Sequence, residues 1–359
     1  MRAAVLEAYG EPLDVREVPD PDPGPDGAVV EVEACGVCRS DWHAWKGHGE
    51  WADDRVPLGL TLGHEPAGTV VETGANVERV REGDRVVVPF SLGDGTCPAC
   101  RTGHGNVCAD GAALGFEAAA PGAFAEYVRV PNADYNAVEL PAFLSPRDAA
   151  ALGCRYMTAY HALADRAGLS GGEWLAVHGC GGVGLSAVQI GSALGARVVA
   201  VDLDEDALGR AVELGADATV NARETADAVD AVVEAVRDAT DGGAAVSMDA
   251  LGIAETCRNS VRCLKPRGTH VQVGLTTDAE EGEVSLPTDW MTRWEIDFVG
   301  SRGMPPTDYG RLFDLVEAAG VDPGALVTRE VALSEVSDRL AAMDDYGTAG
   351  VEVVTEFSG

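Results

Sequence analysis

Short apolar runs separated by glycine- and proline-rich turns dominate residues 1–154. Examples are AVVEVEACGV (28–37), AGTVVETG (67–74), GDRVVVPF (83–90) and FAEYVRV (124–130). Valine-containing runs of this length, bounded by turn-forming residues, are typical of strands. The pattern therefore predicts an antiparallel β domain in the first part of the chain.

The pattern changes near residue 155. Strand-like segments such as WLAVHG (174–179) and ARVVAVD (196–202) now alternate with alanine-rich amphipathic stretches such as VGLSAVQIGSALG (183–195) and EDALGRAVELG (205–215). This alternation predicts an α/β domain, in which helices cover both faces of a parallel sheet. We assign this domain to residues 155–298 and expect residues 299–359 to rejoin residues 1–154.

Length and hydropathy fit this division. A chain of 359 residues suits two ordinary domains, and 46% hydrophobic residues supply a core for each. No apolar run reaches the length of a membrane span. The start of the chain lacks a basic segment followed by an apolar one, so we predict no signal peptide and a cytoplasmic location.

The charge is strongly unbalanced. Asp and Glu number 59 against 26 Lys and Arg, a net charge of −33, and only Lys46 and Lys265 are lysines. Nucleic-acid binding needs a basic surface and is excluded. An excess of this size makes a fold repel itself at low ionic strength. At about 1 M salt the Debye length falls to roughly 3 Å, and this repulsion is largely screened. We interpret the composition as salt adaptation; the alternative is a soluble protein that is merely acidic.

The segment GCGGVG (179–184) matches the pattern G-x-G-x-x-G between a predicted strand and a predicted helix. Such glycines allow a tight turn and close approach to a pyrophosphate, which the helix N-terminus attracts. Asp202 ends the next strand, where a carboxylate binds ribose hydroxyls and repels a 2′-phosphate, so NAD is preferred to NADP. The alternatives are a plain tight turn and a solvated surface acid. The cofactor-site residues assigned here are Gly179, Gly181, Gly182, Val183, Gly184 and Asp202.

Nine cysteines, an odd number, argue against a disulfide framework. Cys38, His64 and Cys154 lie in the segments GVCRSDWH (36–43), GHE (63–65) and LGC (152–154). Together with GDRV (83–86), FAEYV (124–128) and the glycine-rich turn, these segments resemble the zinc-dependent medium-chain alcohol dehydrogenases over essentially the whole chain. The resemblance implies a GroES-like β domain and a Rossmann domain, with the active site in the cleft between them.

The resemblance also implies roles for individual residues. Cys38, His64 and Cys154 match the three ligands of a catalytic zinc, which leave a fourth position open. Asp41 and Glu65 match acidic residues that orient the histidine ligand and tune the charge of the metal.

Further matches concern the proton and the cofactor. Ser40 and His43 match a relay that carries the alcohol proton to solvent by way of the cofactor ribose. Arg39 matches a pyrophosphate contact and Thr158 a residue near the nicotinamide, and Val273 is assigned to the same cofactor site. Independently of the family, zinc lowers the pKa of a bound water to about 7 and acts in the same way on an alcohol. The expected partner is therefore a small alcohol or its aldehyde or ketone.

A second cluster reads DGTCPACRTGHGNVC (94–108). The family carries four cysteines around a structural zinc here, and Cys97, Cys100 and Cys108 match the last three. Asp94 stands where the first cysteine belongs. Three thiolates and one carboxylate still form a tetrahedral site. Alternatives are His104 as the fourth ligand and a lobe that has lost its metal.

Other interpretations remain open at this point. Cys35 and Cys38 form a C-x-x-C pair, but a redox pair of this kind usually opens a helix in a βαβ unit. A polyol or sugar dehydrogenase is the alternative enzyme, although Cys154 favours simple alcohols because relatives acting on polyols often use a carboxylate there. A non-catalytic NAD-binding protein is the third alternative.

Aromatic residues suggest the kind of substrate. The family resemblance places four of them near the substrate cleft, which indicates an apolar alcohol, and it implies a homodimer or homotetramer. The four residues are Trp42, Trp51, Phe90 and Phe124.

Overall fold

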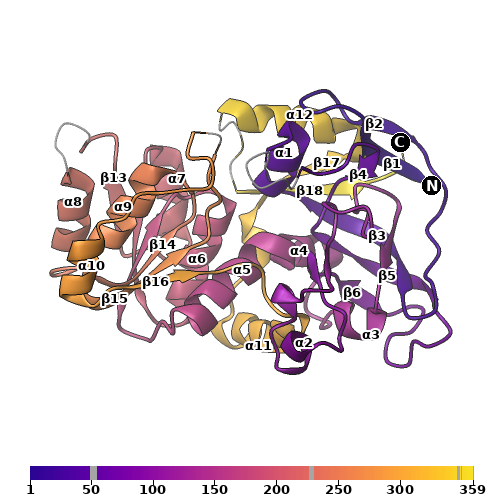
Figure 1. The fold of residues 1–359 in the computed structure, drawn as a ribbon, viewed down its shortest axis with the longest axis horizontal. Helices are drawn as coiled ribbons and strands as arrows, with labels where there is room; N and C mark the ends of the chain where they lie inside the picture. The colour runs from indigo at the N-terminus through magenta and orange to yellow at the C-terminus, as the bar shows by residue number, and fades with distance from the viewer. Residues whose placement is uncertain (49–54, 226–229, 278, 346–347, 349, 359) are drawn as a thin grey trace. The chain divides into compact units, whose positions relative to one another are not determined.

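The structure is a computed structural model that describes residues 1–48, 55–225, 230–277, 279–345, 348 and 350–358 (Figure 1). Trp51 lies outside the described residues. The chain forms two compact units, one from residues 1–157, 303–314 and 322–359, the other from residues 158–302 and 315–321. The predicted assignment of catalysis and cofactor binding to separate domains stays a prediction.

The first unit is built on a seven-stranded sheet in the order β10-β6-β5-β3-β18-β17, with β9 also paired to β3. All pairs are antiparallel except β17 and β18, which run parallel. The pattern of buried and exposed residues along β3 follows the valine-rich run that predicted it. The strands are β3 (Ala28–Val37), β5 (Pro66–Thr73), β6 (Arg85–Val87), β9 (Tyr127–Val130), β10 (Val138–Glu139), β17 (Val327–Ala332) and β18 (Val351–Glu356).

Two smaller sheets complete the strands of this unit, in the orders β2-β1-β4 and β7-β8. Their strands are β1 (Arg2–Leu6), β2 (Asp14–Glu17), β4 (Leu60–Thr61), β7 (Ser91–Leu92) and β8 (Ala112–Ala113). The helices of this part of the chain are α1 (Arg39–Lys46), α2 (Pro98–Arg101), α3 (Ala133–Asn136), α4 (Pro146–Ala151) and α12 (Val336–Ala342). The C-terminal strand β18 pairs with β3, so the end of the chain joins the first sheet as expected.

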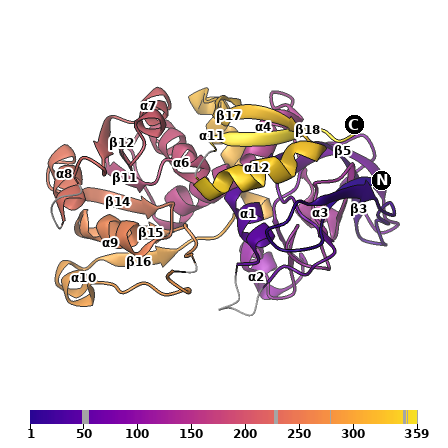
Figure 2. The same cartoon turned by 90° about the horizontal axis from the view of Figure 1, so that it is seen from above.

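The second unit contains a six-stranded parallel sheet in the order β13-β12-β11-β14-β15-β16 (Figure 2). From the central strand β11 the chain adds β12 and β13 on one side, and it then crosses back to add β14, β15 and β16 on the other side. This is the doubly wound arrangement that the strand–helix alternation predicted. The strands are β11 (Trp174–His178), β12 (Arg197–Asp202), β13 (Ala218–Asn221), β14 (Ala244–Asp249), β15 (Leu264–Gln272) and β16 (Asp297–Gly300).

Two pairs of helices pack on this sheet. Helices α6 and α7 contact each other and strands β11 to β13. Helices α8 and α9 contact each other, with α8 against β13 and α9 against β11, β14 and β15. Right-handed crossovers that reverse direction at β11 place one pair on each face. The remaining helices are α5 (Met157–Tyr160), α6 (Gly182–Ala193), α7 (Glu205–Glu213), α8 (Ala231–Ala239), α9 (Ala254–Arg262), α10 (Thr288–Trp294) and α11 (Tyr309–Ala319). Among the described residues, no helix has the length and apolar character needed to cross a membrane.

Candidate active site and metal centres

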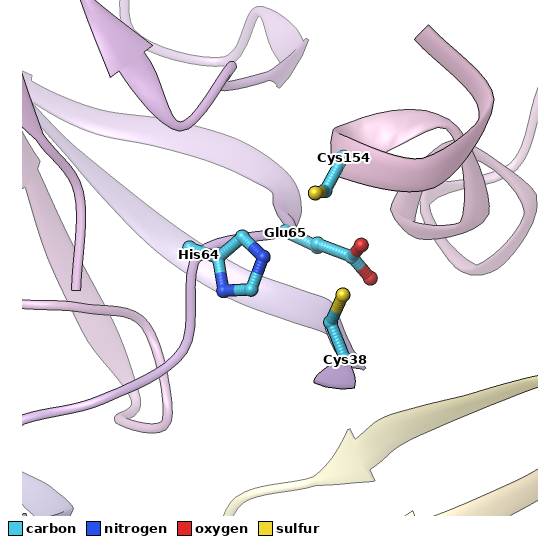
Figure 3. A group of neighbouring side chains, drawn as sticks. All are labelled: Cys38, His64, Glu65 and Cys154. Carbon is cyan, nitrogen blue, oxygen red and sulfur yellow. The ribbon is translucent and has the colours of Figure 1, made fainter. Parts of the chain in front are cut away.

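The first unit brings Cys38, His64, Glu65 and Cys154 together, with one possible ligand atom of each within 4.8 Å of the others (Figure 3). Cys38 follows the end of β3 and caps α1, and His64 and Glu65 precede β5. Cys154 lies in a π-helical turn, Leu152–Tyr156. All four residues are buried. Three predicted zinc ligands that are distant in sequence therefore meet at one point.

The glycines of these motifs are required by the close packing around the cluster. Gly63 has φ +96, and a Cβ atom there would lie 2.5 Å from the backbone nitrogen of Phe124. At Gly153 a Cβ atom would lie 2.9 Å from the Cα atom of Glu65. A larger residue at either position would push His64 or Glu65 out of place, and at Gly63 the backbone also has a φ that only glycine adopts without strain.

Asp41 fixes the orientation of His64. Its Oδ1 atom lies 2.8 Å from His64 Nδ1, and its Oδ2 atom accepts a hydrogen bond from the Cys38 N–H at 2.9 Å. A carboxylate at this position keeps the proton on Nδ1 and leaves the Nε2 lone pair free. His64 Nε2 is buried and has no hydrogen-bond partner among the described residues. The histidine is therefore prepared to donate its Nε2 lone pair toward the two sulfurs.

The two cysteines shift each other's pKa in opposite directions. The hydrogen bond with Cys154 lowers the pKa of Cys38 well below its ordinary value, although burial opposes this and the charge of Arg155 assists it. The same hydrogen bond, together with burial, raises the pKa of Cys154. Cys38 is thus the more acidic of the two thiols, which suits a pair of sulfurs that binds a cation.

Arg155 was missed by the sequence analysis. Its guanidinium is buried and forms an ion pair with Glu65: Nη2 donates to Oε2 and Nε donates to Oε1 at 3.2 Å. Nη1 donates to the carbonyl of Val37 at 3.1 Å. Burial raises the pKa of Glu65 to about 7, and the positive charge of Arg155 opposes that rise. The sequence did contain a signal for this ion pair. Arg155 is a lone arginine in the apolar run ALGCRYMTA, and a buried arginine is nearly always paired with an acidic group.

Ser40 and His43 lie on α1, one turn apart, so they share a face of that helix. Ser40 Oγ is 3.9 Å from Cys38 Sγ, which places the serine beside the metal-binding cluster. Arg39 donates a hydrogen bond to the carbonyl of Met343 at 3.0 Å and lies over the Trp42 ring, 4.1 Å from its centroid.

The predicted cofactor-binding turn lies in the second unit, where Gly179 leaves β11 with φ +92 and α6 begins at Gly182. A Cβ atom on Gly184 would overlap the carbonyl of Gly179, so the turn and the helix are in close contact. Asp202 ends the neighbouring strand β12, and its Oδ2 accepts a hydrogen bond from Cys180 N–H at 2.6 Å. The carboxylate thus lies directly beside the glycine-rich turn.

Two more predicted cofactor residues lie in this unit. The N–H of Val273 donates to the carbonyl of Asp249, the last residue of β14, at 3.1 Å. Val273 is therefore at the same carboxyl edge of the sheet as the glycine-rich turn. Thr158 is buried on α5, and its Oγ1 has no hydrogen-bond partner among the described residues.

The second cluster also assembles: Asp94, Cys97, Cys100 and Cys108 each place a possible ligand atom within 4.8 Å of the others. The Sγ atoms of Cys97 and Cys108 are 3.6 Å apart. The backbone N–H groups of Cys97 and Thr96 donate to Asp94 Oδ1 and lower the pKa of that carboxyl group. Within the described chain, His104 does not belong to this group.

Helix α3 supports this lobe through residues that the sequence analysis did not identify. Asn136 is buried and forms two hydrogen bonds of 2.9 Å with the backbone of Gly93, directly before Asp94. Tyr135 packs so closely that a Cβ atom on Gly93 or Gly105 would collide with its ring. Burial and neighbouring Cys100 raise the pKa of Tyr135 above its ordinary value. Nothing in the four letters ADYN distinguishes this support from a surface turn.

Comparison with known proteins identifies the family. Residues 24–142 match the family described as "Alcohol dehydrogenase GroES-like domain", and residues 182–318 match "Zinc-binding dehydrogenase". An NAD-dependent alcohol dehydrogenase of Sulfurisphaera tokodaii is 33% identical over 360 residues, 99% of this chain and of that one. A sorbitol dehydrogenase of Halalkalibacterium halodurans is 32% identical over 344 residues, covering 93% of this chain and 94% of its own.

Solved structures support the same family assignment. The alcohol dehydrogenase TADH from Thermus sp. ATN1 superposes with a TM-score of 0.86 at 30% identity, covering 99% of this chain and 100% of its own. The chain belongs to the zinc-binding alcohol dehydrogenases of the medium-chain dehydrogenase/reductase superfamily, and it is therefore an enzyme. The predicted fold, a GroES-like domain with a parallel-sheet Rossmann-like domain, is confirmed.

Proposed function

We propose that this enzyme interconverts an alcohol and its aldehyde or ketone by zinc-dependent hydride transfer to NAD. The observation that carries the proposal is His64 Nε2, which is buried without a partner in the described chain, beside the sulfurs of Cys38 and Cys154. An unsatisfied buried nitrogen costs free energy unless a ligand completes it. Two cysteines and a histidine are a ligand set of catalytic zinc, with a fourth position left for substrate. The residues fit the metal.

Cys38, His64 and Cys154 would hold the zinc, which when bound lowers the pKa of a coordinated hydroxyl group. Asp41 keeps His64 in the required tautomer. Ser40 begins the proton path beside the cluster, and His43 follows on the same helix face.

The cofactor proposal rests on the second unit. The glycine-rich turn at the start of α6 leaves room for a pyrophosphate, and Asp202 beside it is suited to bind ribose hydroxyls. Val273 and Thr158 complete the site, and Arg39 is proposed as a pyrophosphate contact. We accordingly assign NAD binding to residues 155–298 and catalysis to residues 1–154 and 299–359.

A second, structural zinc is proposed at Asp94, Cys97, Cys100 and Cys108. The grouping of their ligand atoms supports it, as does the exclusion of His104 from that group in the described chain. A closed site of four protein ligands stabilises its lobe and takes no part in the reaction.

The test is an assay of NADH formation with simple alcohols and with polyols, combined with metal analysis. His64→Ala should abolish turnover and remove the catalytic zinc, while NAD binding is retained. Full activity in metal-free enzyme would refute the proposal. Turnover of polyols alone would favour the polyol dehydrogenase, and NAD binding without any turnover would favour the non-catalytic alternative.

Salt adaptation is also proposed, on the net charge of −33. Activity and melting temperature should rise steeply from low to molar salt as the self-repulsion is screened. A melting temperature that does not change across that range would refute this proposal.

Homo-oligomerisation is proposed through the edge strand β16. This strand ends the parallel sheet, and Phe298 on it and Trp294 before it are 40% and 37% exposed. An uncovered edge with apolar side chains is suited to pair with a second copy. Light scattering should give a dimer or tetramer, and Phe298→Lys should shift it toward monomer; a monomeric parent protein would refute the proposal.

A cytoplasmic location is proposed because none of the nine cysteines, all of which are among the described residues, is in a disulfide, as expected in a reducing compartment. Recovery of the enzyme from a secreted or periplasmic fraction would refute it.

A further inference from the structure

A third histidine lies beside the predicted relay. Helix α1 ends at Lys46, and Gly47 turns the chain with φ 73. The turn brings His48 back, so that its backbone N–H donates to the carbonyl of His43 at 3.0 Å. The Nδ1 atoms of the two imidazoles are 2.9 Å apart. Two nitrogens at this distance share a proton, because one must donate to the lone pair of the other.

The pair is held in a defined environment. The Trp42 ring contacts both imidazoles edge to face, with centroids 4.9 Å away in each case, and its Nε1–H donates to Asp344 at 2.7 Å. Lys46 also donates to Asp344, at 2.7 Å. Among the described charged groups, Asp344 and Lys46 lie at the Trp42 side of the pair, and Arg39 lies over the Trp42 ring. Both imidazoles are partly exposed, so solvent reaches them.

We propose that His48 extends the proton relay of this enzyme by one step beyond His43. A proton that reaches His43 binds at Nε2. The Nδ1–H bond of His43 then breaks as a new Nδ1–H bond forms on His48, and the Nε2–H of His48 is released to water. An imidazole can receive at one nitrogen and release at the other, so the charge moves without movement of either ring. Exchange with solvent resets the tautomers between turnovers.

This inference rests on the proposed role of His43. It gives the half-buried His–His contact a role in proton transfer, whereas two imidazoles in contact gain nothing when both are charged. A purely structural role for His48 predicts instead that any residue able to accept a hydrogen bond at the same place would serve equally well.

His48→Asn is the matched variant. Its Oδ1 can accept the hydrogen bond of His43 at nearly the position of Nδ1, but it does not take up the proton. His48→Ala removes both functions. Zinc- and NAD-loaded enzyme is mixed with alcohol and a pH indicator in a stopped-flow instrument, and NADH formation and proton release are followed together across pH.

Both variants should release the proton about tenfold more slowly below neutral pH, less than the 10²- to 10⁴-fold effect of a direct general base because water partly replaces the imidazole. Free imidazole should restore the rate, and the difference from the parent enzyme should shrink at high pH. Unchanged proton release in both variants would overturn the proposal. A loss that imidazole does not rescue, or one confined to His48→Ala, would also overturn it, because a structural role produces that result.

A second measurement does not depend on turnover. With only seven histidines in the chain, 15N-labelled imidazoles can be resolved, and a nitrogen–nitrogen coupling across the shared proton should be present in the parent enzyme and absent in His48→Asn. Absence of this coupling in the parent enzyme would overturn the proposed pair. If the parent enzyme oxidises no alcohol, the proposed function fails, and the coupling still reports on the pair independently.

Discussion

Replacement of Arg155 by Met tests the charge balance beside the metal site. The side chains of Arg155 and Glu65 are 6% and 0% exposed, so the substitution leaves a buried carboxylate without its counter-charge. Removing one partner of a buried ion pair typically costs about 3–5 kcal/mol. In a unit of this size, where 1 kcal/mol shifts the melting temperature by about 2–4 °C, the loss is about 6–20 °C.

The assay is thermal unfolding of zinc-loaded enzyme at low and molar salt. Because the pair is buried, the loss should persist in molar salt. The control is Arg16→Met, since Arg16 is 43% exposed and pairs with Glu7 and Asp14 at the surface. That change should cost less than about 1 kcal/mol.

The double variant Glu65→Gln with Arg155→Met separates charge from packing. It should recover much of the stability, because the uncompensated charge is gone, and the two single effects should therefore be non-additive. An Arg155→Met enzyme that melts within about 1 °C of the parent would refute the reasoning, as would a double variant whose losses simply add.

Three further predictions concern other parts of the molecule. Asp202→Ser should narrow or reverse the preference for NAD over NADP, measured as the ratio of kcat/KM values, and an unchanged ratio would contradict the role of Asp202. Asp94→Ala should reduce the zinc content from about two ions per chain to one and expose the lobe to proteolysis; a single zinc in the parent enzyme would contradict the second site. Burial lowers the pKa of His178 to about 3 and of His270 to about 4. The unfolded state, with ordinary pKa values near 6.5, then binds more protons, so stability falls as pH drops below about 6.5, by about 2 kcal/mol per histidine at pH 5. Urea unfolding measured across pH should show this loss. The slope of the unfolding free energy against pH should be smaller for His270→Asn than for the parent enzyme, and equal slopes would contradict the prediction.

The local pattern of apolar and polar residues was sufficient to predict the strands and helices that bury one or both faces. The valine-rich run at 28–37 is strand β3, and the apolar strand before GCGGVG is β11, because burial in a sheet demands such residues. The metal-binding cluster required the family motifs. Nothing in the spacing of Cys38, His64 and Cys154 places three distant positions together.

The residues missed by the sequence analysis share a physical reason. His48 meets His43 only because Gly47 takes a left-handed conformation at the end of α1. Asn136 supports the second lobe through the backbone of Gly93, which is distant in sequence. Such contacts depend on the path of the backbone and not on the residue type, so a pattern of hydrophobic and polar positions does not reveal them.

The π-helical turn that carries Cys154 has a consequence for how this segment can change. A π turn contains one residue more per turn than an α-helix, and a second one, His161–Arg166, follows after α5. Deleting a single residue from Leu152–Tyr156 would let the helix return to regular geometry, because the π turn holds the extra residue while the helix beyond it stays in register. Cys154 and Arg155 could then not both keep their positions beside Glu65. A one-residue deletion in this stretch would therefore break the cluster, and Gly153, Cys154 and Arg155 each tolerate few substitutions because of the contacts described above.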